Sequence, residues 1–109
     1  MIHHPLTLTE FQQIVCDNKD KLIVIDFCAK WCGPCINIAK RVEALETTFG
    51  VSNVFVIKCD VDESNEVSDE FKIQSLPTFV FIKNGVFQNS VIGANIDGVE
   101  SMITSLINF

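Results

Sequence analysis

Two cysteines separated by two residues are the part of this sequence best suited to chemistry. Cys32 and Cys35 enclose Gly33 and Pro34 and follow an apolar run over residues 22–28. Such a pair can close and open a disulfide, or supply two of the four ligands of a structural zinc site. No second pair with this spacing occurs, and the remaining candidate zinc ligands are scattered along the chain: His3, His4, Cys16, Cys28 and Cys59. Redox chemistry is therefore favoured, while structural zinc and two chance buried cysteines remain as alternatives.

The pair stands between a predicted strand and a predicted helix, and this position gives its two sulfurs different expected roles. If Cys32 is the N-cap, the amide of Cys35 is a natural donor to the Cys32 sulfur, because Pro34 has no N–H. A helix N-terminus also carries about half a positive charge, which stabilises a thiolate. We therefore expect Cys32 to be the nucleophile and Cys35, one turn inside, to be the resolving thiol. Gly33 and Pro34 are expected to tune the pair, since Pro34 restricts the loop in both redox states.

One carboxylate interrupts the apolar run that precedes the cysteines. Burial of Asp26 in a strand would raise its pKa, and a carboxyl that titrates near neutral pH can exchange protons there. Our hypothesis is that Asp26 takes the proton from Cys35, through water, when Cys35 resolves a mixed disulfide. The alternative is an ordinary carboxylate at a strand end. Lys58, near the end of the next predicted strand, either pairs with Asp26 and opposes the pKa rise or is simply solvated.

The apolar periodicity predicts alternating helices and strands that must position these groups. Strands are expected over residues 22–28, 54–59, 78–82 and 86–92, and Asn84-Gly85 indicates a type I′ hairpin. Helices are expected from the capping box at Thr7, behind the cysteines as far as Phe49, over residues 64–71, and at the C-terminal end with Asp97 and Glu100 as caps. A strand–helix–strand unit implies a right-handed parallel crossover, and the hairpin adds an antiparallel edge. The sequence therefore predicts one α/β domain over residues 1–109 with a small mixed sheet, and a short edge strand over residues 1–4.

Composition excludes several other classes of protein. The 109 residues carry a net charge of −6, which argues against a nucleic-acid partner or an anionic membrane surface. No apolar run is long enough to span a membrane, and the first residues do not resemble a signal peptide, so we expect a cytoplasmic protein. The acidic run over residues 60–70 fails as a calcium loop, because Asn65 and Phe71 stand where Gly and Glu are required. The other cysteines, Cys16, Cys28 and Cys59, are expected to be core residues.

Several segments together resemble the thioredoxin family. Ile25-Asp26-Phe27 and Trp31-Cys32-Gly33-Pro34-Cys35 are similar to its active-site strand and turn. Further similar segments follow in the same order: Asp60-Val61-Asp62, Leu76-Pro77-Thr78-Phe79, Lys83-Asn84-Gly85 and Gly93-Ala94-Asn95. The resemblance implies a mixed sheet of four or five strands with four flanking helices, and a cis bond before Pro77, which would face the cysteines. It also implies a shallow apolar groove that accepts an extended substrate at the main chain of Leu76, formed by Trp31, Leu76, Pro77, Gly93 and Ala94.

The resemblance also implies an activity and its partners. The family reduces protein disulfides by dithiol–disulfide exchange, in electron transport and cell redox homeostasis. It uses no bound cofactor, because an NADPH-dependent thioredoxin reductase supplies the electrons. Peroxiredoxins and ribonucleotide reductase are typical acceptors, and we expect a monomer. A redox-sensitive binding module that uses the same groove, and an oxidant or isomerase, are the alternative readings.

Two positions depart from the usual family pattern. Ile36 directly follows the second cysteine, where the family often has Lys, so a stabilising positive charge is missing. Lys40 stands where the family usually has a helix-kinking proline, so a straighter helix is expected. Both departures bear on redox poise and choice of client more than on the reaction.

Overall fold

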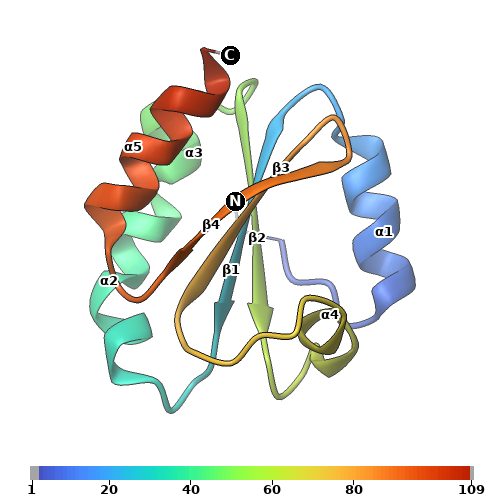
Figure 1. Ribbon diagram of the computed structural model, residues 1–109, viewed down its shortest axis with the longest axis vertical. Coiled ribbons are helices and arrows are strands. Elements are labelled where there is room, and N and C mark those ends of the chain that lie inside the picture. Colours follow the sequence, from blue (N-terminus) through green and yellow to red (C-terminus); the bar gives the residue numbers. More distant parts are fainter. Residues whose placement is uncertain (1–2, 109) are drawn as a thin grey trace.

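The sheet at the centre of the fold is mixed, as the sequence predicts. A computed structural model describes residues 3–108 (Figure 1). It contains four strands in the order β2-β1-β3-β4, which are β1 (Leu22–Cys28), β2 (Val54–Asp60), β3 (Thr78–Lys83) and β4 (Val86–Ile92). The strands β1 and β2 run parallel, while β3 is antiparallel to both β1 and β4. This arrangement confirms the parallel crossover followed by an antiparallel hairpin.

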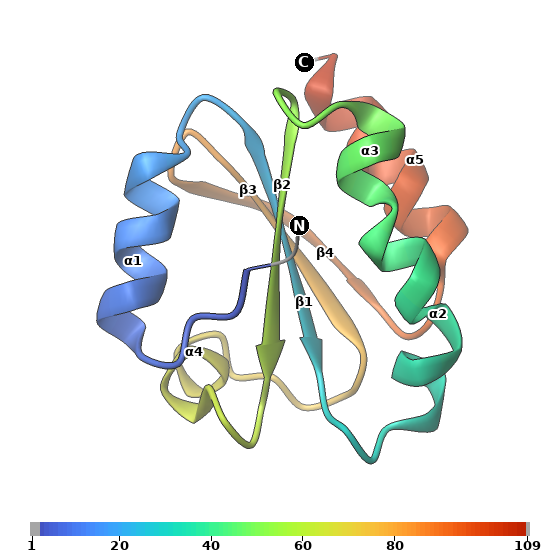
Figure 2. The ribbon, with the colours of Figure 1, turned by 180° about the vertical axis from the view of Figure 1, so that it is seen from behind.

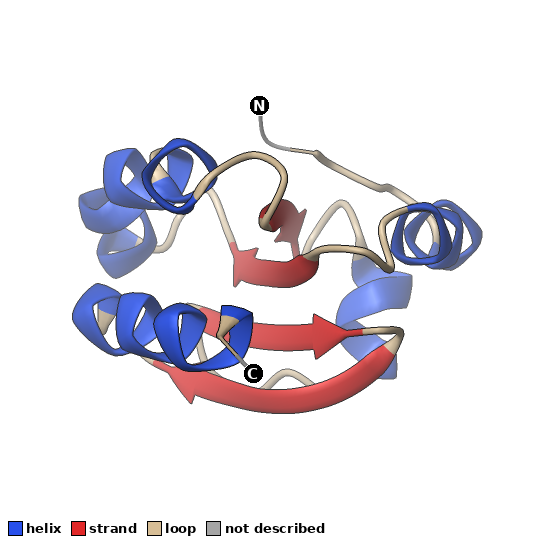
Figure 3. Ribbon diagram, turned by 90° about the horizontal axis from the view of Figure 1, so that it is seen from above, coloured by secondary structure: helices blue, strands red, loops and turns tan. Residues whose placement is uncertain are grey.

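Helices cover both faces of this sheet (Figure 3). They are α1 (Leu8–Asp17), α2 (Gly33–Glu43), α3 (Leu45–Phe49), α4 (Asn65–Glu70) and α5 (Ile96–Ile107). Figure 2 shows α1 and α4 on one side and α2, α3 and α5 on the other. Leu22 and Val24 of β1 pack into the core under α2 and α5, whereas Ile23, Ile25 and Phe27 pack into the core under α1 and α4. All seven residues of β1 are buried, which explains why its sequence is a nearly continuous apolar run.

Two local features predicted from the sequence, a helix cap and a hairpin turn, are confirmed. The Thr7 side chain accepts a hydrogen bond from the Glu10 amide at 3.1 Å and caps α1. Asn84 and Gly85 have φ angles of 55° and 77°, the left-handed values that a type I′ hairpin requires. These residues fix the start of the first helix and the register of the β3–β4 hairpin.

The helix expected behind the cysteines is two helices. The segment α2 ends at Glu43, Ala44 joins the segments, and α3 begins at Leu45. The buried side chains continue across this junction with Val42 and Leu45, so the apolar periodicity alone does not show the interruption. Residues 3–108 consequently contain five helices, where the resemblance implied four. The interruption lies beyond Lys40, and a straighter helix at that residue stays a prediction.

The cap expected for the last helix was wrong. Asn95 is the N-cap of α5, and its side chain accepts a hydrogen bond from the Gly98 amide at 3.0 Å. A Cβ atom at residue 98 would collide with the Asn95 Nδ2 atom, so a larger residue there would displace the capping side chain. Asp97 and Glu100 instead form ion pairs with Arg41 of α2, at 2.8 and 2.9 Å. The two acidic residues therefore tie α5 to α2 and do not cap the helix.

The outer edge of β2 is covered by groups from other segments. His3 forms an isolated bridge with Ile57, and its backbone carbonyl accepts a hydrogen bond from the Lys58 amide at 2.8 Å. The buried Glu46 carboxylate of α3 accepts a hydrogen bond from the Val56 amide at 2.7 Å. The edge strand predicted for residues 1–4 is thus a single bridge in the part that is described, and residues 1 and 2 lie outside the described residues. Within residues 3–108, no helix is long and apolar enough to cross a membrane.

Candidate active site

The two cysteines lie at the start of α2, just after the end of β1. The chain turns after the strand, and the Cys32 amide donates a hydrogen bond to the Ala29 carbonyl at 3.2 Å. Cys32 is the N-cap of α2, and its sulfur accepts a hydrogen bond from the Cys35 amide at 3.2 Å. The two residues are joined by a disulfide, with their Cα atoms 5.3 Å apart. The expected N-cap position and the expected pairing are both confirmed.

The start of α2 sets the electrostatic environment of the pair. The Cys32 sulfur lies at the positive end of the helix and receives an N–H, both of which favour a negative charge on it. Pro34 lies in the first turn and contributes no donor, so the Cys35 amide takes that place. The Cys32 and Cys35 residues are only 5% and 8% exposed, while Gly33 and Pro34 are exposed. The pair is therefore held just below the surface at a site suited to a thiolate.

Asp26 is the buried carboxyl of this end of the sheet. It is 4% exposed, and its Oδ1 atom has no hydrogen-bond partner among the described residues. Burial raises the pKa of Asp26 from 3.8 to about 6, and the positive charge of Lys58 partly opposes that rise. Lys58 stands directly across from Asp26 in the β1–β2 register. The expected pKa shift and the opposing effect of Lys58 are thus both present.

The five groove residues come together only in part. The Leu76–Pro77 bond is cis, as expected, and the Pro77 carbonyl accepts a hydrogen bond from the Gly93 amide at 2.8 Å. Leu76 is half-buried and packs against the cluster that holds both cysteines. Trp31 is 70% exposed, and Ala94 is also exposed. The structure joins Pro77 to Gly93 and brings Leu76 to the cysteines, while the assignment of all five to one groove stays a prediction.

Sequence reasoning missed the residue that holds Trp31. The indole N–H of Trp31 donates a hydrogen bond to the Asp62 carboxylate at 2.8 Å, and the Asp62 amide donates one to the Asp60 carboxylate at 2.9 Å. This acceptor belongs to the acidic run over residues 60–70, which was considered from its sequence only as a calcium loop. An exposed tryptophan beside the cysteines needs an acceptor for its N–H, which is the signal that could have pointed to a nearby carboxylate.

The remaining cysteines differ from one another. Cys28 and Cys59 are buried, as expected, but Cys16 is exposed on α1, which contradicts its expected core position. Cys16 belongs to the outer side of an amphipathic helix, where apolar character alone does not enforce burial. Burial, together with the nearby Asp26 carboxylate, raises the pKa of each of the two buried thiols to about 12. Residues 3–108 contain no group of three or more His, Cys, Asp or Glu side chains arranged to hold a metal ion.

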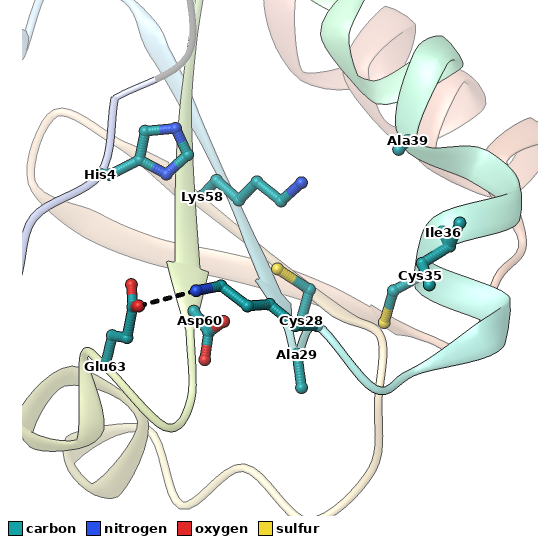
Figure 4. Close-up of a pocket in the computed structure, with 10 residues that line it drawn as sticks. His4, Cys28, Ala29, Cys35, Ile36, Ala39, Lys58, Asp60 and Glu63 are labelled. Carbon is teal, nitrogen blue, oxygen red and sulfur yellow. Dashed lines mark hydrogen bonds and ion pairs between the residues drawn. The ribbon is translucent and has the colours of Figure 1, made fainter.

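A cleft of about 410 Å³ opens beside Cys35, between α2 and the end of β2 (Figure 4). Small or apolar side chains form one part of its lining, and charged side chains form the other. The lining residues are His4, Cys28, Ala29, Lys30, Cys35, Ile36, Ala39, Lys58, Asp60 and Glu63. Cys28 belongs to the same buried cluster as Cys32 and Cys35. Of the two paired cysteines, Cys35 borders this cleft, which no pattern in the sequence predicted.

Comparisons with known proteins agree with this geometry. The family model described as Thioredoxin matches residues 3–105. The chain is 38% identical to a thioredoxin of Coprinus comatus, over 88% of this chain and 89% of the relative. It is 41% identical to thioredoxin-1 of Schizosaccharomyces pombe, over 87% and 88%. The crystal structure of Fasciola hepatica thioredoxin superimposes with a TM-score of 0.89 at 39% identity, covering 94% of this chain and 97% of that one. The chain therefore belongs to the thioredoxin family, whose members are protein-disulfide oxidoreductases.

Proposed function

We propose that this chain reduces protein disulfides with Cys32 as the nucleophile and Cys35 as the resolving thiol. The observation that carries the assignment is the position of the Cys32 sulfur, at the N-terminus of α2 and within 3.2 Å of the Cys35 amide. A thiolate is the reactive form in disulfide exchange, and this environment favours it at Cys32. Cys35 is close enough to close the disulfide that completes the reaction.

The reaction then proceeds in two exchanges. The Cys32 thiolate attacks one sulfur of the client disulfide, forming a mixed disulfide and releasing the first client thiolate. Cys35 loses its proton and attacks the Cys32 sulfur, so the mixed disulfide breaks and the second client thiolate leaves. Two electrons have passed to the client, and the chain holds the Cys32–Cys35 disulfide. An external dithiol or reductase must restore the reduced pair.

Asp26 is proposed as the acceptor of the Cys35 proton, through water. Its burial in β1 and its pKa of about 6 support this role, because such a carboxyl exchanges protons near neutral pH. Lys58, together with Gly33 and Pro34, is proposed to tune the pair. An Asp26→Asn variant whose reduction rate and pH profile match those of the wild type would remove Asp26 from the mechanism.

The client is proposed to lie in the groove of Trp31, Leu76, Pro77, Gly93 and Ala94. The packing of Leu76 against the cysteine cluster and the hydrogen bond from Trp31 to Asp62 support a preformed contact surface. Ile36 is 62% exposed directly after the pair and extends its apolar rim. This rim and Lys40 are the features we expect to set redox poise and the choice of client.

The partners follow from the family. We propose an NADPH-dependent thioredoxin reductase as the electron source, with peroxiredoxins and ribonucleotide reductase as acceptors, for a cytoplasmic monomer. One neighbour, at 35% identity and a TM-score of 0.85, comes from a study of thiol resolution in a yeast mitochondrial 1-Cys peroxiredoxin through glutathione and thioredoxin systems. That neighbour supports a peroxiredoxin as one client class.

Insulin reduction in the presence of dithiothreitol tests the proposal. We expect the wild type to turn over insulin and Cys32→Ser to lose turnover by at least about a thousandfold, because no other thiol can take its place. Cys59→Ala, on the other face of the sheet, is the matched control and should retain turnover. Equal activity of Cys32→Ser and wild type would overturn the assignment, and client binding without turnover would favour the binding module.

A redox titration separates a reductase from an oxidant. Known values are about −270 mV for thioredoxins and about −180 mV for protein disulfide isomerase. We expect the Cys32–Cys35 couple to lie nearer to the thioredoxin value. A potential at or above that of the isomerase would instead indicate an oxidant or isomerase.

A further inference from the structure

The edge strand β4, at the opposite border of the sheet from β2, carries exposed apolar side chains on one face (Figure 1). Phe87 is 56% exposed and Ile92 is 68% exposed. In the β3–β4 register Phe87 stands across from Ile82, whose side chain packs into the core under α1 and α4. Phe87 therefore points to that side of the sheet, because paired residues share a face. Exposed apolar side chains gathered on one face commonly mark a contact surface.

Two clefts join along this face into one groove. A cleft of about 310 Å³ is lined by α1 and Phe87, and a cleft of about 260 Å³ is lined by the chain after α4 and by Ile92. Phe71 and Phe87 line both clefts. We call this surface the β4 groove and define it by Phe11, Phe71, Ile73, Phe87 and Ile92. It follows β4 from the hairpin to the last residue of the strand.

The floor and wall of the β4 groove are held in place by contacts within the fold. The Phe71 ring contacts Phe11 edge to face, with the centroids 5.7 Å apart, and contacts Phe27 at 5.5 Å. In the wall after α4, the Thr78 hydroxyl donates a hydrogen bond to the Ser75 carbonyl at 2.6 Å. The groove is thus preformed, which lowers the cost of binding.

One end of the β4 groove meets the proposed client groove. Ile92 directly precedes Gly93, Ser75 directly precedes Leu76, and both Ile92 and Ser75 line the smaller cleft. A chain that reaches the cysteine pair through the client groove can therefore continue along β4. Between the positions facing Ile92 and Phe87, β3 advances four residues, or about 13 Å.

The charges of the lining favour an uncharged occupant. Among the described residues, Glu70 and Lys72 are the charged residues that line the two clefts, one in each. The net charge of −6 also disfavours an acidic occupant. An extended segment with apolar side chains matches both the shape and the charge of the groove.

The geometry of β4 disfavours a second copy of the chain as the occupant. The β3–β4 register shifts between Phe81 and Ile82, so the strand has a bulge in its middle. The Ser90 amide donates a hydrogen bond to the Asn89 side chain at 2.8 Å, which satisfies one edge group locally. Both features oppose the regular strand pairing that a second copy would need at this edge. A segment laid on the face needs only side-chain contacts.

We propose that the β4 groove binds an extended, uncharged client segment that carries apolar side chains within about eight residues of the reacting cysteine. Two side chains four residues apart lie on one face of an extended segment and match the spacing from Ile92 to Phe87. The inference rests on the proposed function, since the client disulfide still reacts with Cys32. It adds a second surface that selects clients by the sequence beside their cysteine.

Two peptides of equal length test this selection. Each has one cysteine in a disulfide with thionitrobenzoate, and one has apolar residues at alternate positions of an eight-residue arm where the other has serine. The arm is placed on each side of the cysteine in turn. Thionitrobenzoate release by the reduced protein gives a second-order rate constant, after the rate with Cys32→Ser is subtracted. We expect the apolar arm, in one of the two directions, to raise this constant about tenfold.

Adjacent residues of β4 supply the variant and its control. Val86 is 59% exposed, like Phe87, but it lines neither cleft. We expect the advantage of the apolar arm to be lost in Phe87→Ser and kept in Val86→Ser. Equal advantages in the two variants, or none in the wild type, would overturn the proposal. Release no faster than with Cys32→Ser for every peptide would contradict the proposed function instead.

NMR locates the arm on the wild-type protein. With the apolar peptide carrying serine in place of its cysteine, we expect saturable shifts of the amides of Phe71, Phe87 and Ile92. Shifts confined to Trp31 and Ala94 would contradict the proposal. Shifts of the Phe87 and Ile92 amides that depend on protein concentration without peptide would identify a second copy as the occupant and would also overturn it. The same spectra show whether each variant is folded.

Discussion

Two sets of cysteines lie at the same end of the sheet and differ in what surrounds them. Cys32 and Cys35 lie at the start of a helix, where an amide points at one sulfur and the helix favours negative charge. Cys28 and Cys59 lie at the ends of β1 and β2, where the sole polar contact of the Cys28 thiol among the described residues is the Cys59 carbonyl at 3.8 Å. Burial raises the pKa of both strand thiols to about 12. Because the residue type is the same, we attribute the expected difference in thiol reactivity to the two environments, a helix N-terminus for one set and buried strand ends for the other.

Alkylation tests this contrast most strongly. At pH 7 a thiol with a pKa of about 12 is about one part in 10⁵ thiolate, compared with a few per cent for an ordinary cysteine. We expect iodoacetamide to label Cys28 and Cys59 of the folded, reduced protein at least about a thousandfold more slowly than the exposed Cys16. Mass spectrometry of digests measures the rates, and labelling in urea provides the unfolded control. Equal rates for Cys16 and Cys28 in the folded protein would break the comparison.

The second largest effect is expected from Asp26, on the stability of the folded protein. The pKa of Asp26 is raised from 3.8 to about 6, so the folded chain binds more protons than the unfolded chain between those values. Stability therefore falls as pH rises through this window, and the buried carboxylate lowers stability above it. Asp26→Asn should raise the free energy of unfolding by up to about 3 kcal/mol at pH 7.5, with the gain vanishing below about pH 4.

Urea unfolding of the oxidised protein at the two pH values measures this difference. The exposed Asp20→Asn serves as a control and should change stability little at either pH. A gain for Asp26→Asn that is equal at pH 7.5 and pH 4 would show that packing, and not the carboxylate charge, is its source.

The smallest effect is expected from Lys58, on the pKa of the buried groups near it. The charge of Lys58 lowers the pKa of both Asp26 and Cys28, opposing their burial. Lys58→Met should therefore raise the pKa of Asp26 further, as measured by NMR titration of its carboxyl carbon. Lys40→Met, which removes an exposed charge from α2, should leave that titration unchanged. A lower Asp26 pKa in Lys58→Met would contradict this electrostatic account.

Local chemistry made most of the fold predictable from the sequence. The nearly continuous, β-branched apolar run of β1, the cap at Thr7 and the turn at Asn84-Gly85 each act within a few residues, and each is confirmed. The N-cap position of Cys32 follows from the same local logic, because Pro34 removes the competing donor. The buried Asp26 was evident because a carboxylate inside an apolar strand has few alternatives to burial.

The features that were missed depend on contacts between distant segments. Asp97 was a plausible cap, but Arg41 of α2 holds it and Asn95 caps the helix. The partner of the Trp31 indole, Asp62, comes from the chain after β2. The cleft beside Cys35 exists because small residues of β1 and α2 face charged residues of β2. No periodicity within one element encodes such a space.

The covered edge of β2 has a consequence for self-association. An edge strand with free amides and carbonyls is a template for another chain, and proteins commonly block it. Here the Val54, Val56 and Lys58 amides donate to the Gly50 carbonyl, the Glu46 carboxylate and the His3 carbonyl, and the Val56 carbonyl accepts from His3. A second molecule would have to break these bonds before it could add a strand. This edge is therefore protected against strand addition and aggregation by one buried glutamate and one histidine backbone.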